Sequence, residues 1–277
     1  MPAMQAQPGM PLWLDLATTD IDTAKRFYAE LVGWEYREHG QGYAVATKNG
    51  MPVAGIGAIP EEKISMWGLA LYTPNVTVAH NAAVNAGARS VLEPRVLGAP
   101  EGEGADGETD RGEMAVVIDP SGAAIGLKNP ADEHALFAAG EPGTPVWHEL
   151  MVGQGWDETL EFYHELAGWD IRVDKNSDGS RYALGEFEGA ALVGLWDTQQ
   201  MQLPSMWTLY LGVADIDVAV DTARGLGAQI IREPYDSEFG RVATITDPTG
   251  ALLNLTEVEE YVPDETEDFE PDLFADL

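Results

Sequence analysis

Hydrophobic residues recur with helical spacing in four segments of the chain. The spacing is clearest in residues 24–32 and 159–167, where apolar side chains return every three or four positions. Shorter copies occupy residues 79–86 and 219–226. Gly33 and Gly168 follow the two longer segments, at the position of a C-terminal cap, and Gly87 and Gly227 follow the shorter ones. The pattern predicts four helices.

Between these segments the apolar residues alternate with period two, which is typical of half-buried strands. In PLWLDL the residues Leu12, Leu14 and Leu16 form one apolar face, and PVWHEL at residues 145–150 has the same pattern. Asn49-Gly50 favours a tight hairpin, and the segments DPSG and DPTG favour type I turns. Each unit therefore reads β-α-β-β-β, and the chain contains four of them.

The halves of the chain are copies of each other. FYAELVGW, from Phe27 to Trp34, differs from FYHELAGW, from Phe162 to Trp169, only at its third and sixth letters, and IDPSGA matches TDPTGA. The duplication predicts two domains at residues 10–130 and 145–257, a linker at 131–144 and an acidic tail at 258–277. Ala99–Asp110, the large excess of the first copy, is expected to form an exposed loop.

Composition removes several classes of function. The chain has no cysteine, so disulfides, thiolate zinc sites and a cysteine nucleophile are excluded. The net charge of −32 disfavours nucleic acid and anionic membranes as partners. Neither a signal peptide nor an apolar stretch long enough to span a membrane is found, which predicts a soluble, cytoplasmic protein. The acidic tail is expected to be disordered or loosely docked. The oligomeric state stays open.

The order of these motifs carries a family resemblance. An opening strand, then D-x-D-x-A-x-x-FY-x-x-L-x-GW and finally GR-x-A-x-x-x-DP-x-GA, resembles the glyoxalase, bleomycin-resistance and extradiol-dioxygenase superfamily, also called vicinal oxygen chelate proteins. The resemblance covers residues 11 to about 256. It implies an α+β fold in which four βαβββ modules form two glyoxalase-like domains, with curved, cup-shaped mixed sheets and helices outside. It leaves open which modules pair.

Strand alternation indicates which side chains line each cup. If Leu12, Leu14 and Leu16 lie under the helix, then Trp13 and Asp15 face the first cup. The same parity turns Trp147 and Glu149 into the second cup. His148 faces the other way, and we expect it to be packed and hydrogen-bonded.

The resemblance implies a divalent metal, held by His, Gln or Glu on the opening strand and by Glu on the closing strand. This chain has Trp13 and Gly126 at those positions in the first half, and Trp147 and Asn254 in the second. Gly68 and Thr208 stand at the third strands. None is a good ligand for a catalytic cation, so we expect no metal cofactor. Asp15 or Glu149, with a pKa raised in an apolar cup, could act as a base instead, although simple hydrogen bonding is the commoner role.

Aromatic side chains on the cup strands are the stronger lead. Stacking and apolar contact can hold an uncharged planar ligand without a metal, although about half of such residues simply pack. Arg241 belongs to the second half only, since Glu113 replaces it in the first, and it could bind an anionic group or pair with a neighbouring acid. The candidate ligand-binding residues are Trp147, Glu149, Tyr182, Thr208, Tyr210, Arg241, Asn254, Trp13, Asp15 and Tyr43.

Three hypotheses follow from these residues. The first is a metal-independent protein that binds an aromatic or amphipathic metabolite or antibiotic, with the ligand in the second cup. The second is an enzyme, either a glyoxalase-like lyase or isomerase or a dioxygenase, which uses a non-standard metal site or Asp15 or Glu149 as base. The third is an assembly protein whose cups are filled by its own side chains.

Overall fold

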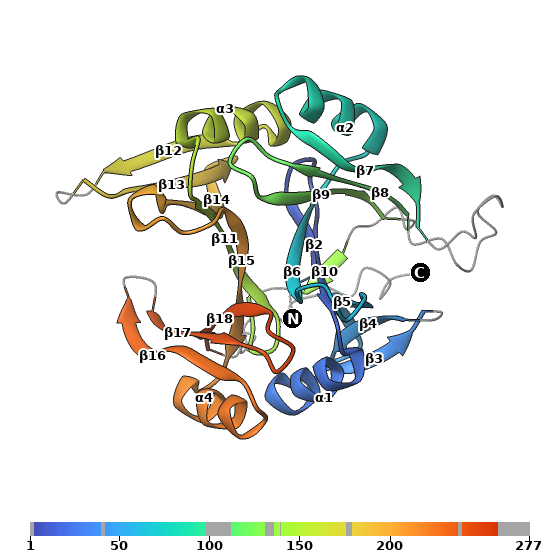
Figure 1. Ribbon diagram of the computed structural model, residues 1–277, viewed down its shortest axis with the longest axis vertical. Helices are drawn as coiled ribbons and strands as arrows, with labels where there is room; N and C mark the ends of the chain where they lie inside the picture. The colour runs from blue at the N-terminus through green and yellow to red at the C-terminus, as the bar shows by residue number, and fades with distance from the viewer. Residues whose placement is uncertain are drawn as a thin grey trace, which may run out of the picture.

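The structure is a computed structural model that describes residues 3–39, 42–97, 112–130, 136–138, 140–175, 179–237 and 240–259. It confirms the predicted α+β fold, with two eight-stranded mixed sheets and four helices (Figure 1). The loop predicted at Ala99–Asp110 and nearly all of the acidic tail lie outside the described residues. No helix in the described part of the chain is long and apolar enough to cross a membrane.

The first half follows the predicted order of elements. Its bounds are β2 Pro11–Thr18, α1 Ile21–Val32, β3 Glu35–Glu38, β4 Tyr43–Lys48, β5 Met51–Ala58, β6 Met66–Tyr72, α2 Val76–Asn85, β7 Arg89–Val96, β8 Glu113–Ile118 and β9 Ala124–Asn129. The second half repeats this order. Its bounds are β11 Pro145–Val152, α3 Trp156–Ala167, β12 Asp170–Lys175, β13 Arg181–Phe187, β14 Ala190–Asp197, η1 Gln199–Met201, β15 Met206–Val213, α4 Ile216–Gly225, β16 Gln229–Ser237, β17 Gly240–Thr246 and β18 Leu252–Glu257.

The sheet order settles which modules pair. The strands run β3-β4-β5-β2-β6-β9-β8-β7 in the first sheet and β12-β13-β14-β11-β15-β18-β17-β16 in the second. The opening strands of the two modules in each half, β2 with β6 and β11 with β15, are antiparallel neighbours at the centre of the sheet. Each cup is therefore built within one half.

The structure has the helix ends and turns that the local sequence predicts. Gly33 and Gly168 end α1 and α3 in the left-handed conformation, with φ of 72° and 70°. Asn49 and Gly50 both have positive φ, as the tight hairpin between β4 and β5 requires. Asp119 accepts hydrogen bonds from the backbone N–H groups of Gly122 and Ala123, which closes the predicted turn.

The halves pack together through the faces opposite the cups. Figure 1 shows α1 beside α4 and α2 beside α3, so each helix pair combines both halves. The Tyr28 hydroxyl donates to Asp247 Oδ2 at 3.0 Å, and the Tyr163 hydroxyl donates to Asp119 Oδ2 at 2.8 Å. The larger of two hydrophobic clusters runs through both halves.

The tryptophan of the repeated octet strengthens the same interface. Trp34 stacks on Tyr28 and donates from Nε1 to the carbonyl of Gly143 at 2.7 Å. Trp169 donates to the carbonyl of Gly9 at 2.9 Å. These contacts are reciprocal, because Gly9 and Gly143 are equivalent positions of the repeat.

One feature of the fold was not predicted. Strand β1, Ala3–Gln5, pairs antiparallel with β10, Leu136–Ala138, which belongs to the segment that we expected to be only a linker. Strand β10 lies beside β5 of the first sheet (Figure 1). The second half has no equivalent two-stranded sheet among the described residues.

Candidate functional site

The opening strands carry a tryptophan and an acid into each cup, as their alternation predicted. Leu12, Leu14 and Leu16 of β2 are buried, whereas Trp13 and Asp15 between them are partly exposed on the other face. Strand β11 has the same register against its neighbours, so Trp147 and Glu149 occupy the equivalent places.

In the second cup, Glu149 lies between two tyrosines. Its Oε2 accepts a hydrogen bond from the Tyr182 hydroxyl at 3.0 Å, and its Oε1 accepts one from Tyr210 at 3.2 Å. Burial raises the pKa of Glu149, and the two hydrogen bonds only partly oppose this shift. Burial, and then the charge of Glu149, raise the pKa of both tyrosines. The raised pKa values favour the protonated forms of the carboxyl and of the two phenols.

The floor of the second cup is polar. The Thr208 hydroxyl donates to the backbone carbonyl of Glu149 at 3.1 Å. Asn254 lies opposite Tyr210 on the neighbouring strand, and its Oδ1 accepts from the Thr244 hydroxyl at 2.7 Å. Thr244 was not among the predicted residues, although its alternation with the buried Ala243 places it in the cup.

A glycine makes room for each acid–tyrosine pair. A Cβ on Gly194 would lie 2.0 Å from the Tyr182 hydroxyl, and a Cβ on Gly55 would lie 2.0 Å from both Asp15 Oδ1 and the Tyr43 hydroxyl. The two glycines are equivalent positions of the repeat. We did not predict their role, but their recurrence after the Tyr43 and Tyr182 strands could have indicated it.

The first cup has a smaller version of this arrangement. Asp15 Oδ1 accepts from the Tyr43 hydroxyl at 2.7 Å and from Trp13 Nε1 at 3.1 Å. Ala70 takes the position of Tyr210, so a second tyrosine is missing there. The ammonium of Lys128 lies 4.9 Å from the Trp13 ring centroid, and Lys128 is buried. Lys128 was also missed, although it is two residues beyond the cup-facing Gly126.

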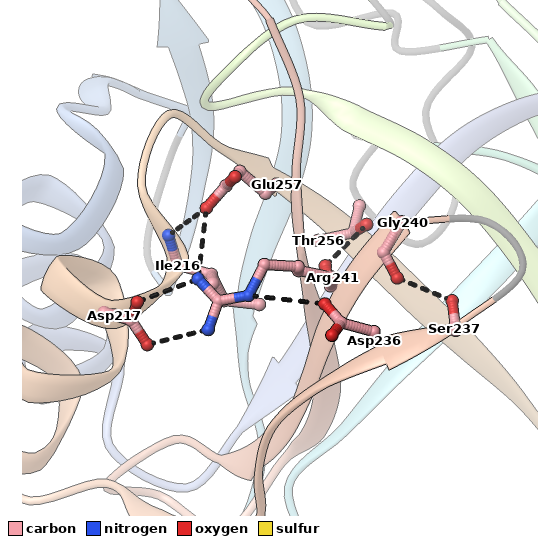
Figure 2. Close-up of polar contacts among 8 residues, drawn as sticks. All are labelled: Ile216, Asp217, Asp236, Ser237, Gly240, Arg241, Thr256 and Glu257. Carbon is pink, nitrogen blue, oxygen red and sulfur yellow. Dashed lines mark hydrogen bonds and ion pairs between the residues drawn. The ribbon is translucent and has the colours of Figure 1, made fainter.

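Arg241 lies apart from this cluster. It shares a face of β17 with the buried Ala243 and Ile245, and its guanidinium forms two hydrogen bonds to Asp217 of α4, at 2.8 and 3.0 Å. Figure 2 shows the guanidinium directed at Asp217, with Asp236 and Glu257 on its other sides. The side-chain hydrogen bond to Asp217 is the main cause that raises the pKa of Arg241. The structure therefore shows the ion pair and does not bring Arg241 together with Trp147 and Glu149.

His148 differs from its expected environment. It lies on the face away from the cup, as predicted, but its buried Nδ1 has no hydrogen-bond partner among the described residues. The hydrogen bond expected for His148 is therefore not formed at Nδ1. Burial lowers the pKa of His148 to about 4. The equivalent residue in the first half is Leu14, which fits an apolar environment without this cost.

The donors at the positions where the resemblance implies a metal have other roles. Thr208 and Asn254 form the hydrogen bonds described above, and Trp13 and Trp147 have only an indole N–H, which cannot coordinate a metal ion. Among the residues that the structure describes, no group of three or more His, Asp or Glu side chains is placed to hold a metal ion. At these positions Thr208 and Asn254 offer only neutral oxygen atoms, and Gly68 and Gly126 offer no side-chain ligand.

Comparisons with known proteins agree with this architecture. Residues 12–127 and 154–256 match the sequence model described as "Glyoxalase-like domain". "Putative glyoxylase CFP32" of Mycobacterium tuberculosis is 30% identical over 89% of this chain and 94% of its own length. "Anthracycline biosynthesis protein DnrV" of Streptomyces peucetius is 26% identical over 92% of this chain and 96% of its own length.

Two solved structures show the same fold at low sequence identity. The Mn(II)-bound glyoxalase from Novosphingobium aromaticivorans superposes with a TM-score of 0.64 at 16% identity, covering 92% of this chain and 84% of that one. An extradiol ring-cleaving dioxygenase from B. fuscum gives a TM-score of 0.62 at 15% identity, covering 96% and 76%.

Proposed function

Since this chain belongs to the Glyoxalase-like domain family, we propose that its second cup binds a planar, uncharged aromatic molecule without the help of a metal ion. The observation that carries the proposal is Glu149, whose carboxyl lies between the hydroxyls of Tyr182 and Tyr210. A neutral carboxyl in this position can donate a hydrogen bond to a carbonyl or phenolic oxygen of a ligand.

The surroundings of Glu149 support a flat ligand. Trp147 lies on the same face of β11, two residues away, and offers a large ring for stacking. Asn254 and Thr244 add polar atoms at the floor, where they can fix the orientation of a ligand. The similarity to an anthracycline biosynthesis protein favours a fused-ring phenolic compound.

A matched pair of tryptophan variants tests this proposal. The probe is 1,8-dihydroxyanthraquinone, and its binding is followed by quenching of tryptophan fluorescence. Trp147→Ala should weaken binding by about 1–3 kcal/mol, the usual scale for removing a large buried ring, whereas Trp13→Ala should change it little. Circular dichroism checks that both variants fold. Equal losses, or a loss only in Trp13→Ala, would place the ligand elsewhere.

A second candidate function is proton transfer by Glu149. The raised pKa of this carboxyl favours it, because burial brings the pKa of a carboxyl closer to neutral pH, where a group can more readily give and accept a proton. The reaction would be a glyoxalase-like isomerisation of a hemithioacetal to a 2-hydroxy thioester, in which one proton moves between neighbouring carbons and another moves between their oxygens. The test is turnover of the hemithioacetal of methylglyoxal and a small thiol, followed by NMR. Turnover by the wild type that is lost in Glu149→Gln would support catalysis by this carboxyl. No turnover by the wild type would reject this second function.

A further inference from the structure

A cleft between the halves lies at the C-terminal end of helix α3. It has a volume of about 310 Å³. Its walls come from the N-terminal loop, from α3 and from the end of β13, through Pro8, Gly9, Leu166, Ala167, Gly168 and Phe187. The opposite wall belongs to the first half and includes Leu71, Tyr72 and Leu127. The cleft lies outside both cups and has no part in the proposed function.

The repeat provides a matched position for comparison at the other end of the interface. Pro142, Gly143, Leu31, Val32 and Gly33 are equivalent to the first five residues of this wall, and Lys48 is equivalent to Phe187. The octets and the P-G-x-P-x-W segments fix the first five pairs, and the ungapped run of residues 43–55 against 182–194 fixes the pair of Lys48 with Phe187. The two ends share the indole hydrogen bonds of Trp34 and Trp169, but Gly9 packs more closely on its helix end: a Cβ on Gly9 would lie 2.0 Å from the Ala167 carbonyl oxygen, and a Cβ on Gly143 would lie 3.0 Å from that of Val32.

At that other end a lysine side chain lies on the equivalent surface. Lys48 Nζ donates to the carbonyl of Val32, the last residue of α1, at 2.7 Å. Its stem passes Gly143, because a Cβ on Gly143 would lie 3.0 Å from Lys48 Cε. The ammonium thus caps the end of α1, where unpaired carbonyls and the helix dipole favour a cation.

The end of α3 has no such lysine. Phe187 replaces Lys48, and the space beside Gly9, Ala167 and Gly168 is the cleft. We propose that this cleft binds a primary alkylammonium group, which takes the place that Lys48 fills at the other end. The carbonyl end of α3 attracts the ammonium, the Phe187 ring adds a cation–π contact, and the apolar wall covers the alkyl chain. The net charge of −32 favours a cation further.

The two indole N–H groups make this proposal testable by NMR. Trp169 Nε1 donates to Gly9 in the wall of the cleft, and Trp34 Nε1 donates to Gly143 at the lysine-filled end. The probe is n-pentylammonium chloride, titrated into ¹⁵N-labelled protein, with 1-pentanol as the neutral ligand of the same length. We expect a saturable shift of the Trp169 indole signal with the amine, a small shift of the Trp34 signal, and at least tenfold weaker binding of the alcohol.

Two exchange variants sharpen the test. Phe187→Lys supplies the missing ammonium from the chain itself, so it should weaken binding of pentylammonium at least tenfold. Lys48→Phe should open the equivalent cleft, so that the Trp34 signal also shifts with the amine. Thermal unfolding checks the fold of both. Equal binding of the alcohol, unchanged binding in Phe187→Lys, or no saturable shift of Trp169 at millimolar amine would overturn the proposal.

Discussion

The two faces of the central strands differ in how closely the halves still match. On the faces that pack together, the central hydrogen bonds have equivalents: Tyr28 with Asp247 and Tyr163 with Asp119. On the cup faces the halves differ. The position of Tyr210 is taken by Ala70 in the first half, and that of Asn254 is taken by Gly126. A residue at the shared interface must fit both copies at once, whereas each cup is built within one half and can change by itself.

This difference explains the meaning of the repeated octet. Its tyrosine and tryptophan donate hydrogen bonds to acceptors outside their own domain: Tyr28 donates to Asp247, and Trp34 donates to the carbonyl of Gly143. The octet thus belongs to the scaffold, as the sequence indicated. It also forms part of the interface between the two domains. Variants of equivalent residues can show where the equivalence ends.

The largest expected effect concerns the shared interface. Tyr28→Phe and Tyr163→Phe should each destabilise the protein by about 2–4 kcal/mol, because each leaves a buried Asp oxygen and a tryptophan N–H without their tyrosine partner. The two losses should be similar. Urea unfolding followed by circular dichroism measures them, and strongly unequal losses would show that the interface has diverged too.

An intermediate effect concerns His148, which has Leu14 as its equivalent in the first half. Its pKa is lowered to about 4 from the ordinary value of 6.5, so the unfolded chain binds a proton that the folded protein does not. The wild type should therefore lose stability as the pH falls from about 6.5 towards 4.

His148→Leu, which copies Leu14, should remove that loss and be more stable than the wild type by about 1–3 kcal/mol near pH 4. The measurement is the free energy of unfolding of both proteins across this range. A constant difference between the two curves would contradict a titrating histidine.

The smallest effect concerns the second cup. Burial raises the pKa of Glu149, so the folded protein holds a proton that the unfolded chain has already released above the ordinary value of 4.5. The wild type should thus become less stable relative to Glu149→Gln as the pH rises from 4.5 through the raised pKa. Thermal unfolding of both proteins at several pH values checks the sign, and an opposite slope would mean that the carboxylate is stabilised in the fold.

Much of the fold could be predicted because its signals are local. Helical spacing, the glycines that end α1 and α3 and the Asn49-Gly50 turn depend only on neighbouring residues, and the structure has each of them. The parity of β2 and β11 also follows from the sequence, so Trp13, Asp15, Trp147 and Glu149 could be placed in the cups. The type of fold came from the order of the motifs.

What only the tertiary structure decided depends on contacts between distant segments. The sequence did not show that Tyr182 and Tyr210 would meet on one carboxyl, that Arg241 would turn to Asp217, or that β10 would pair with β1. Each of these depends on the pairing and curvature of strands far apart in the chain. Alternation gives the face of a strand on which a side chain lies, but the neighbour that it meets there is set by the packing of the whole sheet.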